Sequence, residues 1–254
     1  MPETAAARFK DRLKKRERLI GILLSLPSPE IAEIAAEAGF DWLFIDMEHG
    51  LLDYADTQRM IQAVSGRSAC IVRVPTNEPI WITKALDLGA DGLIFPHISR
   101  AEEAREAVRA ARYPPAGTRS VGIARAQGYG ARVAEYLARA NNEIVLIAQA
   151  EHIDAARNIE EILSVDGVDA VFIGPFDLSA SLGIPGQTTD PKVQEAIARI
   201  RDACAARNIP SGIFARDADG VRRAAEQGFS LLGASTDTLL LSGAARRILD
   251  DIKR

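Results

Sequence analysis

Apolar and polar positions along this chain follow two alternating patterns. Short apolar runs, often β-branched, recur along the chain, and the longer stretches between them carry apolar residues at intervals of three and four. The short runs predict buried strands and the longer stretches predict amphipathic helices. The predicted strands are the eight ranges 19–24, 42–46, 69–73, 92–95, 143–149, 170–173, 211–214 and 231–234.

Helices are predicted between these strands, including 29–38, 80–88, 101–111 and 193–207. Ser28 followed by Pro29 is a typical helix start, with serine as the cap and proline in the first turn. Three helices end in a glycine shortly before a strand, at Gly39, Gly89 and Gly228. Glycine is favoured there because the residue after a helix often adopts a left-handed conformation.

Eight strands joined by helices predict an α/β protein with a parallel sheet, and the number eight favours the closed (β/α)8 TIM barrel. No Gly-x-Gly-x-x-Gly motif follows the first strand, which argues against a dinucleotide-binding sheet. We therefore expect a single barrel domain over residues 1–254, with a short helix at its N-terminus.

Composition narrows the class of protein further. The formal net charge of −4 predicts no nucleic-acid partner. Cys70 and Cys204 are too few for a disulfide framework. No apolar run reaches the ~18 residues of a membrane span, and the charged N-terminus lacks the apolar core of a signal peptide. We expect a cytoplasmic protein with no membrane partner.

Two carboxylates stand where predicted strands end, which is where barrel enzymes carry their chemistry. Strand 143–149 ends at Gln149 and leads to Glu151, and strand 170–173 leads to Asp177. Carboxylates at the rim of a rigid sheet suit a hard divalent cation, which prefers oxygen ligands. The alternative is that both residues only cap the helices that follow.

A histidine and an arginine are predicted at the same rim. His49 follows Asp46 by three residues, so that carboxylate could orient the ring of a general base. His97 and His152 have no carboxylate placed in the same way. Arg73 ends its strand and needs an anionic partner, because an unpaired buried charge is costly. That partner is either a neighbouring carboxylate or a substrate oxyanion.

Together these segments resemble the HpcH/HpaI aldolase family, whose members are class II pyruvate aldolases with a barrel fold. The resemblance extends over residues 18–250. It rests on Asp-Met-Glu-His-Gly at 46–50, Val-Arg-Val-Pro at 72–75, Arg-Tyr-Pro-Pro-Ala-Gly-Thr-Arg at 112–119, Gln-Ala-Glu at 149–151 and Gly-Pro-Phe-Asp-Leu-Ser at 174–179.

The resemblance implies roles for the rim residues. Glu151 and Asp177 would bind a divalent metal, Mg²⁺, Mn²⁺ or Co²⁺. Arg73 would hold the keto oxygen of pyruvate, and His49 with Asp46 would form the acid/base pair.

It also implies a shared active site. Asp87 matches a residue that family members lend to a neighbouring subunit, so we expect a homo-oligomer, a hexamer built as a trimer of dimers. Gln149 matches a residue close to the metal and the substrate. Phe214 stands at a pocket-lining position where leucine occurs elsewhere in the family. Because of this departure, the resemblance does not identify the aldehyde substrate.

Further substrate contacts are expected from the start of a helix at residues 174–176 and from the long connection 113–130. The pyruvate carboxylate would bind where a helix begins at Gly174, Pro175 and Phe176, because a helix N-terminus favours anions. Arg119 and Arg125 lie in the long connection 113–130 and are candidates for binding the aldehyde half.

The predicted function is a divalent-metal-dependent aldolase that reversibly cleaves 4-hydroxy-2-oxo acids to pyruvate and an aldehyde through a metal-bound enolate. Oxaloacetate decarboxylase is the alternative, because loss of CO₂ passes through the same enolate. A non-catalytic metabolite-binding barrel is disfavoured, since a scaffold needs none of the rim residues. No lysine ends a predicted strand, so a Schiff-base route has no candidate nucleophile.

Overall fold

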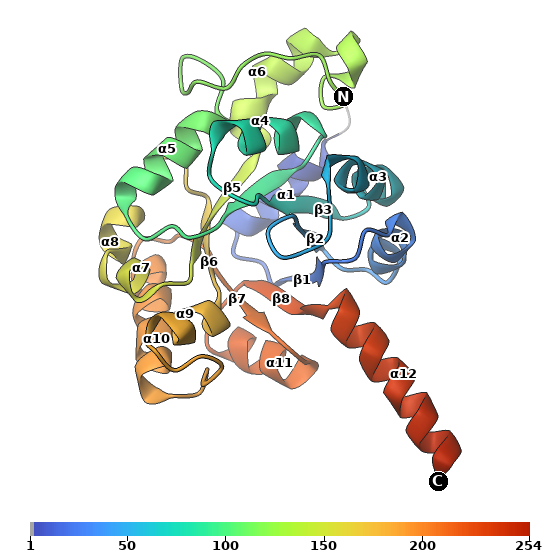
Figure 1. The fold of residues 1–254 in the computed structure, drawn as a ribbon. Helices are drawn as coiled ribbons and strands as arrows, with labels where there is room; N and C mark the ends of the chain where they lie inside the picture. The colour runs from blue at the N-terminus through green and yellow to red at the C-terminus, as the bar shows by residue number, and fades with distance from the viewer. Residues whose placement is uncertain (1–2) are drawn as a thin grey trace.

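Eight parallel strands close into a barrel in chain order, which confirms the predicted (β/α)8 fold (Figure 1). The computed structural model describes residues 3–254. Six of the eight strands begin and end within one residue of the predicted range. The strands are β1 (Leu19–Leu24), β2 (Trp42–Asp46), β3 (Ala69–Arg73), β4 (Gly92–Phe95), β5 (Val145–Ala150), β6 (Ala170–Ile173), β7 (Ser211–Ala215) and β8 (Leu231–Thr236).

Helices surround the barrel and follow the predicted amphipathic stretches. They are α1 (Ala5–Lys14), α2 (Pro29–Glu37), α3 (Tyr54–Val64), α4 (Pro79–Asp87), α5 (Ala101–Ala111), the 3₁₀ turn η1 (Gly128–Gly130), α6 (Val133–Glu143), α7 (Ile153–Arg157), α8 (Ile159–Ile162), α9 (Pro175–Ser181), α10 (Pro191–Ala206), α11 (Ala218–Glu226) and α12 (Asp237–Lys253). Within residues 3–254, no helix has both the length and the apolar character that crossing a membrane requires.

The predicted start of the fifth strand was wrong by two residues. Glu143 ends α6, where its carboxylate accepts hydrogen bonds from Thr4 and Arg139. Ile144 follows as the helix cap, and its N–H donates to the Ala140 carbonyl. The apolar run therefore begins in the last turn of a helix, which periodicity alone does not separate from a strand.

An aromatic cluster fills part of the barrel interior. The ring centroid of Trp42 lies 5.9 Å from that of Phe44 and 5.8 Å from that of Phe172. The Phe9 ring of α1 also packs against the indole, with centroids 6.4 Å apart. Gly21 of β1 faces this indole, and a Cβ there would lie 2.3 Å from the ring. A glycine is therefore required for the tryptophan to fit inside.

One junction repeats around the N-terminal ends of the strands. A glycine with φ between 92° and 98° precedes each even-numbered strand, at Gly39, Gly89, Gly167 and Gly228. Two residues later stands Asp41, Asp91, Asp169 or Ser230. Each aspartate accepts a hydrogen bond from a backbone N–H of the preceding strand, those of Ile20, Cys70 and Leu146 respectively. These bonds join neighbouring strands at this end of the barrel.

Helix α1 covers the same end. Lys10 is buried and pairs with Asp169 at 2.9 Å, and Arg12 pairs with Asp41 at 2.7 Å. Burial lowers the pKa of Lys10, and the charge and hydrogen bond of Asp169 partly offset that effect. The opposite end, where the strands terminate, therefore remains the open face of the barrel.

Helix α12 leaves the barrel and projects away from it (Figure 1). Its first residue is fixed, because the Asp237 carboxylate accepts hydrogen bonds from the N–H groups of Ser25 and Leu26. Farther along, Leu241, Ile248 and Ile252 are 62%, 61% and 75% exposed. Residues seven and four apart lie on one side of a helix, so these three form an exposed apolar face.

Candidate active site

The site is built at the C-terminal ends of β2, β3 and β5. Asp46 ends β2, Arg73 ends β3, and the two are paired neighbours in the sheet. Gln149 lies near the end of β5, and Glu151 follows that strand directly. All four side chains are buried. The structure therefore brings these four predicted residues to one rim, as the strand assignment implied.

Arg73 and Asp46 form a two-point pair. Arg73 Nε donates to Asp46 Oδ1 at 2.9 Å and Nη2 donates to Oδ2 at 2.7 Å. Burial lowers the pKa of Arg73, but the Asp46 hydrogen bonds and charge more than offset it, so the pKa lies above its ordinary value. The sequence left open which anion Arg73 meets; within the chain, Arg73 meets Asp46 and also Glu48, whose Oε2 lies 3.1 Å from Nη1.

The Asp46 carboxylate also fixes the loop that carries His49. Its Oδ1 accepts hydrogen bonds from the N–H groups of Glu48 (3.0 Å) and His49 (3.2 Å). The His49 side chain itself is exposed at the rim. Asp46 thus holds the backbone of His49 and the Arg73 guanidinium, and an acid/base pair between the Asp46 and His49 side chains stays a prediction.

Glu151 receives several donors. His97 N–H donates to its Oε1 at 2.8 Å, and the Gln149 side-chain amide donates to its Oε2. Burial raises the pKa of Glu151, and these two hydrogen bonds limit the rise because they favour the ionised form. Gly174 lies against the same carboxylate, and a Cβ there would stand 3.1 Å from Oε2.

His97 is a site residue that the sequence reasoning missed. Its ring lies between two carboxylates, with Nε2 2.9 Å from Glu48 Oε1 and Nδ1 3.0 Å from Glu151 Oε1. Both partners are far from His97 in the sequence and approach it only when β2, β4 and β5 assemble. The sequence pattern considered above was only a carboxylate placed as Asp46 is before His49, and that pattern does not identify Glu48 and Glu151 as partners of His97.

Glu48, His97 and Glu151 have the chemistry of a divalent-cation site. One ligand atom from each lies within 4.8 Å of the others. Glu48 Oε2 is buried and accepts no hydrogen bond within residues 3–254, although Arg73 Nη1 lies 3.1 Å away. Two carboxylates and an imidazole fit Mn²⁺ or Co²⁺. Asp177 lies in the first turn of α9 with an exposed side chain, outside this three-residue group.

Of the residues expected to bind pyruvate, Gly174 lies next to Glu151. Gly174 is the residue before α9, Pro175 begins the helix, and Phe176 is 42% exposed. Phe214 of β7 is partly buried against the aromatic cluster in the barrel interior. These positions place the start of α9 next to Glu151, as the Gly174 contact shows.

Comparison with known proteins identifies the family of this chain. The family model of HpcH/HpaI aldolase/citrate lyase matches residues 19–244. The chain belongs to this family. It is 42% identical over 240 residues to a hydroxypyruvate/pyruvate aldolase of Sagittula stellata, covering 94% of each chain. It is 36% identical over 248 residues to a 5-keto-4-deoxy-D-glucarate aldolase of an Enterobacter strain, covering 97% of each.

A solved structure supports the same assignment. An HpcH/HpaI aldolase/citrate lyase family protein from Burkholderia cenocepacia superposes with a TM-score of 0.95 at 38% identity, covering 98% of this chain and 100% of that one. The resemblance and the prediction that this chain is an aldolase, a carbon–carbon lyase, are therefore confirmed.

Three predicted site residues of this HpcH/HpaI family member, Asp87, Arg119 and Arg125, lie away from this group. Asp87 ends α4 and accepts a hydrogen bond at 2.8 Å from Arg119, which is buried between Tyr113 and Tyr136. Arg119 is therefore engaged inside the chain, and the expectation that it binds substrate finds no support.

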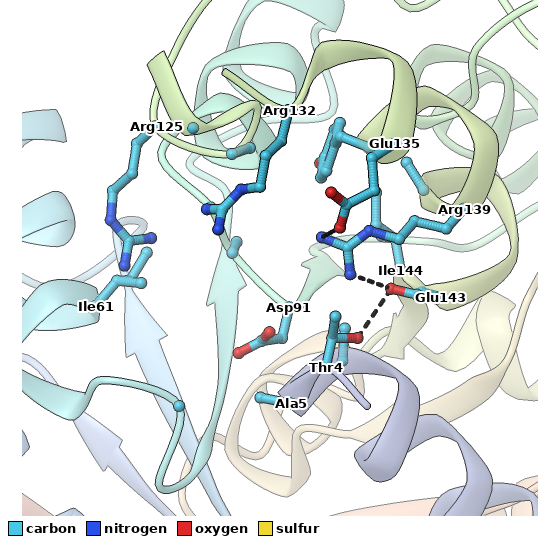
Figure 2. A pocket seen from close by; sticks show the side chains of 18 of the residues that line it. Thr4, Ala5, Ile61, Asp91, Arg125, Arg132, Glu135, Arg139, Glu143 and Ile144 are labelled. Carbon is cyan, nitrogen blue, oxygen red and sulfur yellow. Dashed lines mark hydrogen bonds and ion pairs between the residues drawn. The ribbon is translucent and has the colours of Figure 1, made fainter. Parts of the chain in front are cut away.

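Arg125 faces a cavity of about 840 Å³ beside α1 and α6, together with Asp91 and Arg132 (Figure 2). Its Nη1 donates to the Leu88 carbonyl at 3.0 Å. Because Gly89–Asp91 precedes β4, this cavity adjoins the N-terminal ends of the strands. The structure thus places Arg125 at the opposite end of the barrel from Glu151, not with the other predicted substrate-binding residues.

Proposed function

We propose that this chain is a divalent-metal-dependent aldolase that reversibly cleaves a 4-hydroxy-2-oxo acid into pyruvate and an aldehyde. The observation that carries the proposal is the meeting of Glu48, His97 and Glu151 beside Arg73 at the barrel rim. A cation-binding group next to a fixed guanidinium suits chemistry that develops negative charge on a keto oxygen. The names of the two aldolase relatives support a 2-oxo acid substrate.

The metal would be held by Glu151 and Asp177, as the family resemblance implies, and would be Mg²⁺, Mn²⁺ or Co²⁺. The buried Glu151 carboxylate beside the start of α9, the helix that carries Asp177, supports this position, because carboxylate oxygens are the ligands that a hard divalent cation prefers. When bound, the metal withdraws electron density from the keto group and so favours the enolate over the ketone. Gln149 holds Glu151 in place through its amide hydrogen bond.

Arg73 would bind the keto oxygen of the substrate. Asp46 engages Nε and Nη2 of the guanidinium and thereby fixes its plane. Nη1 lies on the Glu48 side, 3.1 Å from that carboxylate. Because the guanidinium is already oriented, it stabilises the oxyanion without reorganisation as charge develops.

His49 would move the proton of the aldol step. During cleavage its imidazole accepts the proton of the 4-hydroxyl, and during addition it returns that proton to the aldehyde oxygen. Asp46 positions the His49 backbone through a 3.2 Å hydrogen bond. The pyruvate carboxylate would bind at Gly174, Pro175 and Phe176, and Phe214 would line the pocket.

The enzyme would act as a symmetric homo-oligomer, a hexamer built as a trimer of dimers. Asp87 would contribute to a neighbouring subunit's site; it is the last residue of α4, the helix that follows β3. The apolar face of α12, formed by Leu241, Ile248 and Ile252, supports self-association because large apolar residues gather there in the open.

The experiment that tests the function is aldol addition by metal-free and metal-loaded protein. The enzyme is treated with EDTA, dialysed, and incubated with pyruvate or hydroxypyruvate and a panel of aldehydes, with products measured by mass spectrometry. Chelation should abolish product formation, and Mg²⁺, Mn²⁺ or Co²⁺ should restore it. Glu151→Gln should resist restoration, whereas the exposed Glu102→Gln serves as the matched control. Full activity after exhaustive chelation would refute the proposal.

A further inference from the structure

We propose that His97 is a nitrogen ligand of the metal, and that Glu48 is the positioning residue that orients its ring. This inference rests on the proposed function for the presence of a divalent metal at Glu151. It goes beyond that function because it adds an imidazole to an otherwise all-oxygen site. The site would then prefer metals that bind nitrogen as well as oxygen, instead of metals that bind oxygen alone.

The backbone at His97 is held in an uncommon conformation. Its φ is +56°, in the left-handed region that residues with a Cβ seldom adopt. Its N–H donates to Glu151 Oε1 at 2.8 Å, which joins the turn after β4 to the buried carboxylate. Such conformations persist where the surrounding structure fixes them, and they cluster at functional sites. Here the conformation brings the ring to Glu151.

The distances around the ring suit a shared ion. His97 Nδ1 and Glu151 Oε1 are 3.0 Å apart. Two ligand atoms that bind one ion at about 2.1 Å and at right angles are themselves about 3.0 Å apart. An ion can therefore take Nδ1 and a Glu151 oxygen as neighbouring ligands with the ring where it stands.

The second ring nitrogen already has the partner that a metal-binding histidine usually has. His97 Nε2 lies 2.9 Å from Glu48 Oε1. A ligating imidazole commonly donates its other N–H to a carboxylate, which fixes the tautomer and the ring plane. Glu48 is itself held near Arg73 Nη1, 3.1 Å from its Oε2. The proton then resides on Nε2, and the lone pair of Nδ1 faces Glu151.

An imidazole ligand shifts the choice of metal. Carboxylate and water sites suit Mg²⁺, whereas imidazole nitrogen suits first-row transition metals. Among Mg²⁺, Mn²⁺ and Co²⁺, the site should therefore prefer Co²⁺ most and Mg²⁺ least, with Mn²⁺ between them, and His97 should account for that order.

Electron spin-echo envelope modulation of the Mn²⁺-loaded enzyme tests the ligand directly, without an activity assay. Coupling of the Mn²⁺ electron spin to ¹⁴N is expected in the wild type and should be lost in His97→Asn. Asparagine is the matched substitution, because it tolerates the left-handed backbone. His152→Asn is the control, since His152 directly follows Glu151 and is exposed; it should keep the coupling. Replacing the three histidines by ¹⁵N-histidine tests the same assignment in the unchanged chain.

Titration with Mn²⁺ and Mg²⁺ by calorimetry gives a second measurement. His97→Asn should weaken Mn²⁺ binding by about tenfold or more and Mg²⁺ binding by less. Glu48→Gln should weaken Mn²⁺ binding by roughly 10–100-fold, as is typical for loss of a ligand's supporting carboxylate. Bound Mn²⁺ with no ¹⁴N coupling, or coupling that survives in His97→Asn, would overturn this inference and leave the proposed function standing. Failure to bind any divalent metal would overturn both.

Discussion

Arg73 and Asp46 face each other across neighbouring strand ends and share two hydrogen bonds of 2.9 and 2.7 Å. This pair restricts the guanidinium to one plane, which lies over the Phe44 ring at 5.1 Å. The consequence is that only one nitrogen, Nη1, is directed away from Asp46 and towards Glu48. Arginine cannot be replaced by lysine here, because a single ammonium group cannot make a two-point contact.

Arg73→Lys should therefore slow every reaction that passes through the enolate. Loss of a positioned oxyanion donor costs about 10²–10³ in kcat, and we expect this loss in both aldol cleavage and oxaloacetate decarboxylation. Initial rates for the two substrates measure it, with the exposed Arg105→Lys as control. An unchanged rate of decarboxylation would show that Arg73 does not contact the keto oxygen.

His49→Ala should separate the two reactions. Aldol cleavage should fall by about 10²–10⁴, the usual contribution of a positioned acid/base. Decarboxylation of oxaloacetate should fall much less, because no hydroxyl proton has to be removed. The ratio of the two rates under identical metal and pH conditions is the measurement. Equal losses in both reactions would assign His49 a structural or binding role.

Borohydride should not trap an intermediate. The six lysines all lie in helices or at helix ends: Lys10, Lys14 and Lys15 with α1, Lys84 in α4, Lys192 in α10 and Lys253 in α12. A Schiff base needs a lysine at the rim with a lowered pKa. Intact-protein mass spectrometry after pyruvate and borohydride should show no added mass. A pyruvyl adduct on any lysine would contradict the metal mechanism.

Stability should depend on pH through Asp91. Burial raises its pKa to about 6 from the ordinary 3.8. The folded state then holds this proton more tightly than the unfolded state, so the stability that this group provides at low pH is lost as the pH rises through 6. Asp91→Asn does not ionise, and it should gain roughly 2 kcal/mol relative to wild type between pH 4 and pH 7.

Urea unfolding of both proteins across that pH range measures the Asp91 effect. Asparagine keeps a carbonyl oxygen that can accept the hydrogen bond from the Cys70 N–H, so the comparison isolates the charge. A difference in unfolding free energy that does not change with pH would show that Asp91 is not the titrating group.

Charged residues on the apolar face of α12 should reduce the size of the assembly. Leu241→Glu combined with Ile248→Glu places two carboxylates on that exposed face, and we expect a smaller species with the same far-ultraviolet circular dichroism. Light scattering gives the mass. Gly243→Ala on the same helix, where a Cβ meets nothing within 4 Å, is the control. An unchanged mass would show that the α12 face does not mediate assembly.

The sequence predicted the barrel well because most buried strands are bounded by a polar residue, glycine or proline, so that their lengths match short apolar runs. It predicted Asp46, Arg73 and Glu151 at one rim because each stands at the end of such a run. It missed His97, whose partners become neighbours only through the closure of the sheet.

Periodicity also could not show what an arginine in a long loop contacts. Arg119 and Arg125 both lie in 113–130, but the first is buried against two tyrosines and the second faces the cavity beside α1. That placement depends on the path of the whole connection, which local pattern does not determine.

The repeated glycine–aspartate junction and α1 make the N-terminal end of the barrel structurally different from the end that carries the candidate site. Bonds that lock strand to strand and helix to strand lie at the closed end, at Asp41, Asp91 and Asp169. At the open end, the pairs Asp46–Arg73 and His97–Glu151 instead join residues of the candidate site. Substitutions in the rim loops should therefore leave the three aspartate bonds at the closed end intact, so a designer can vary the rim while the barrel still assembles.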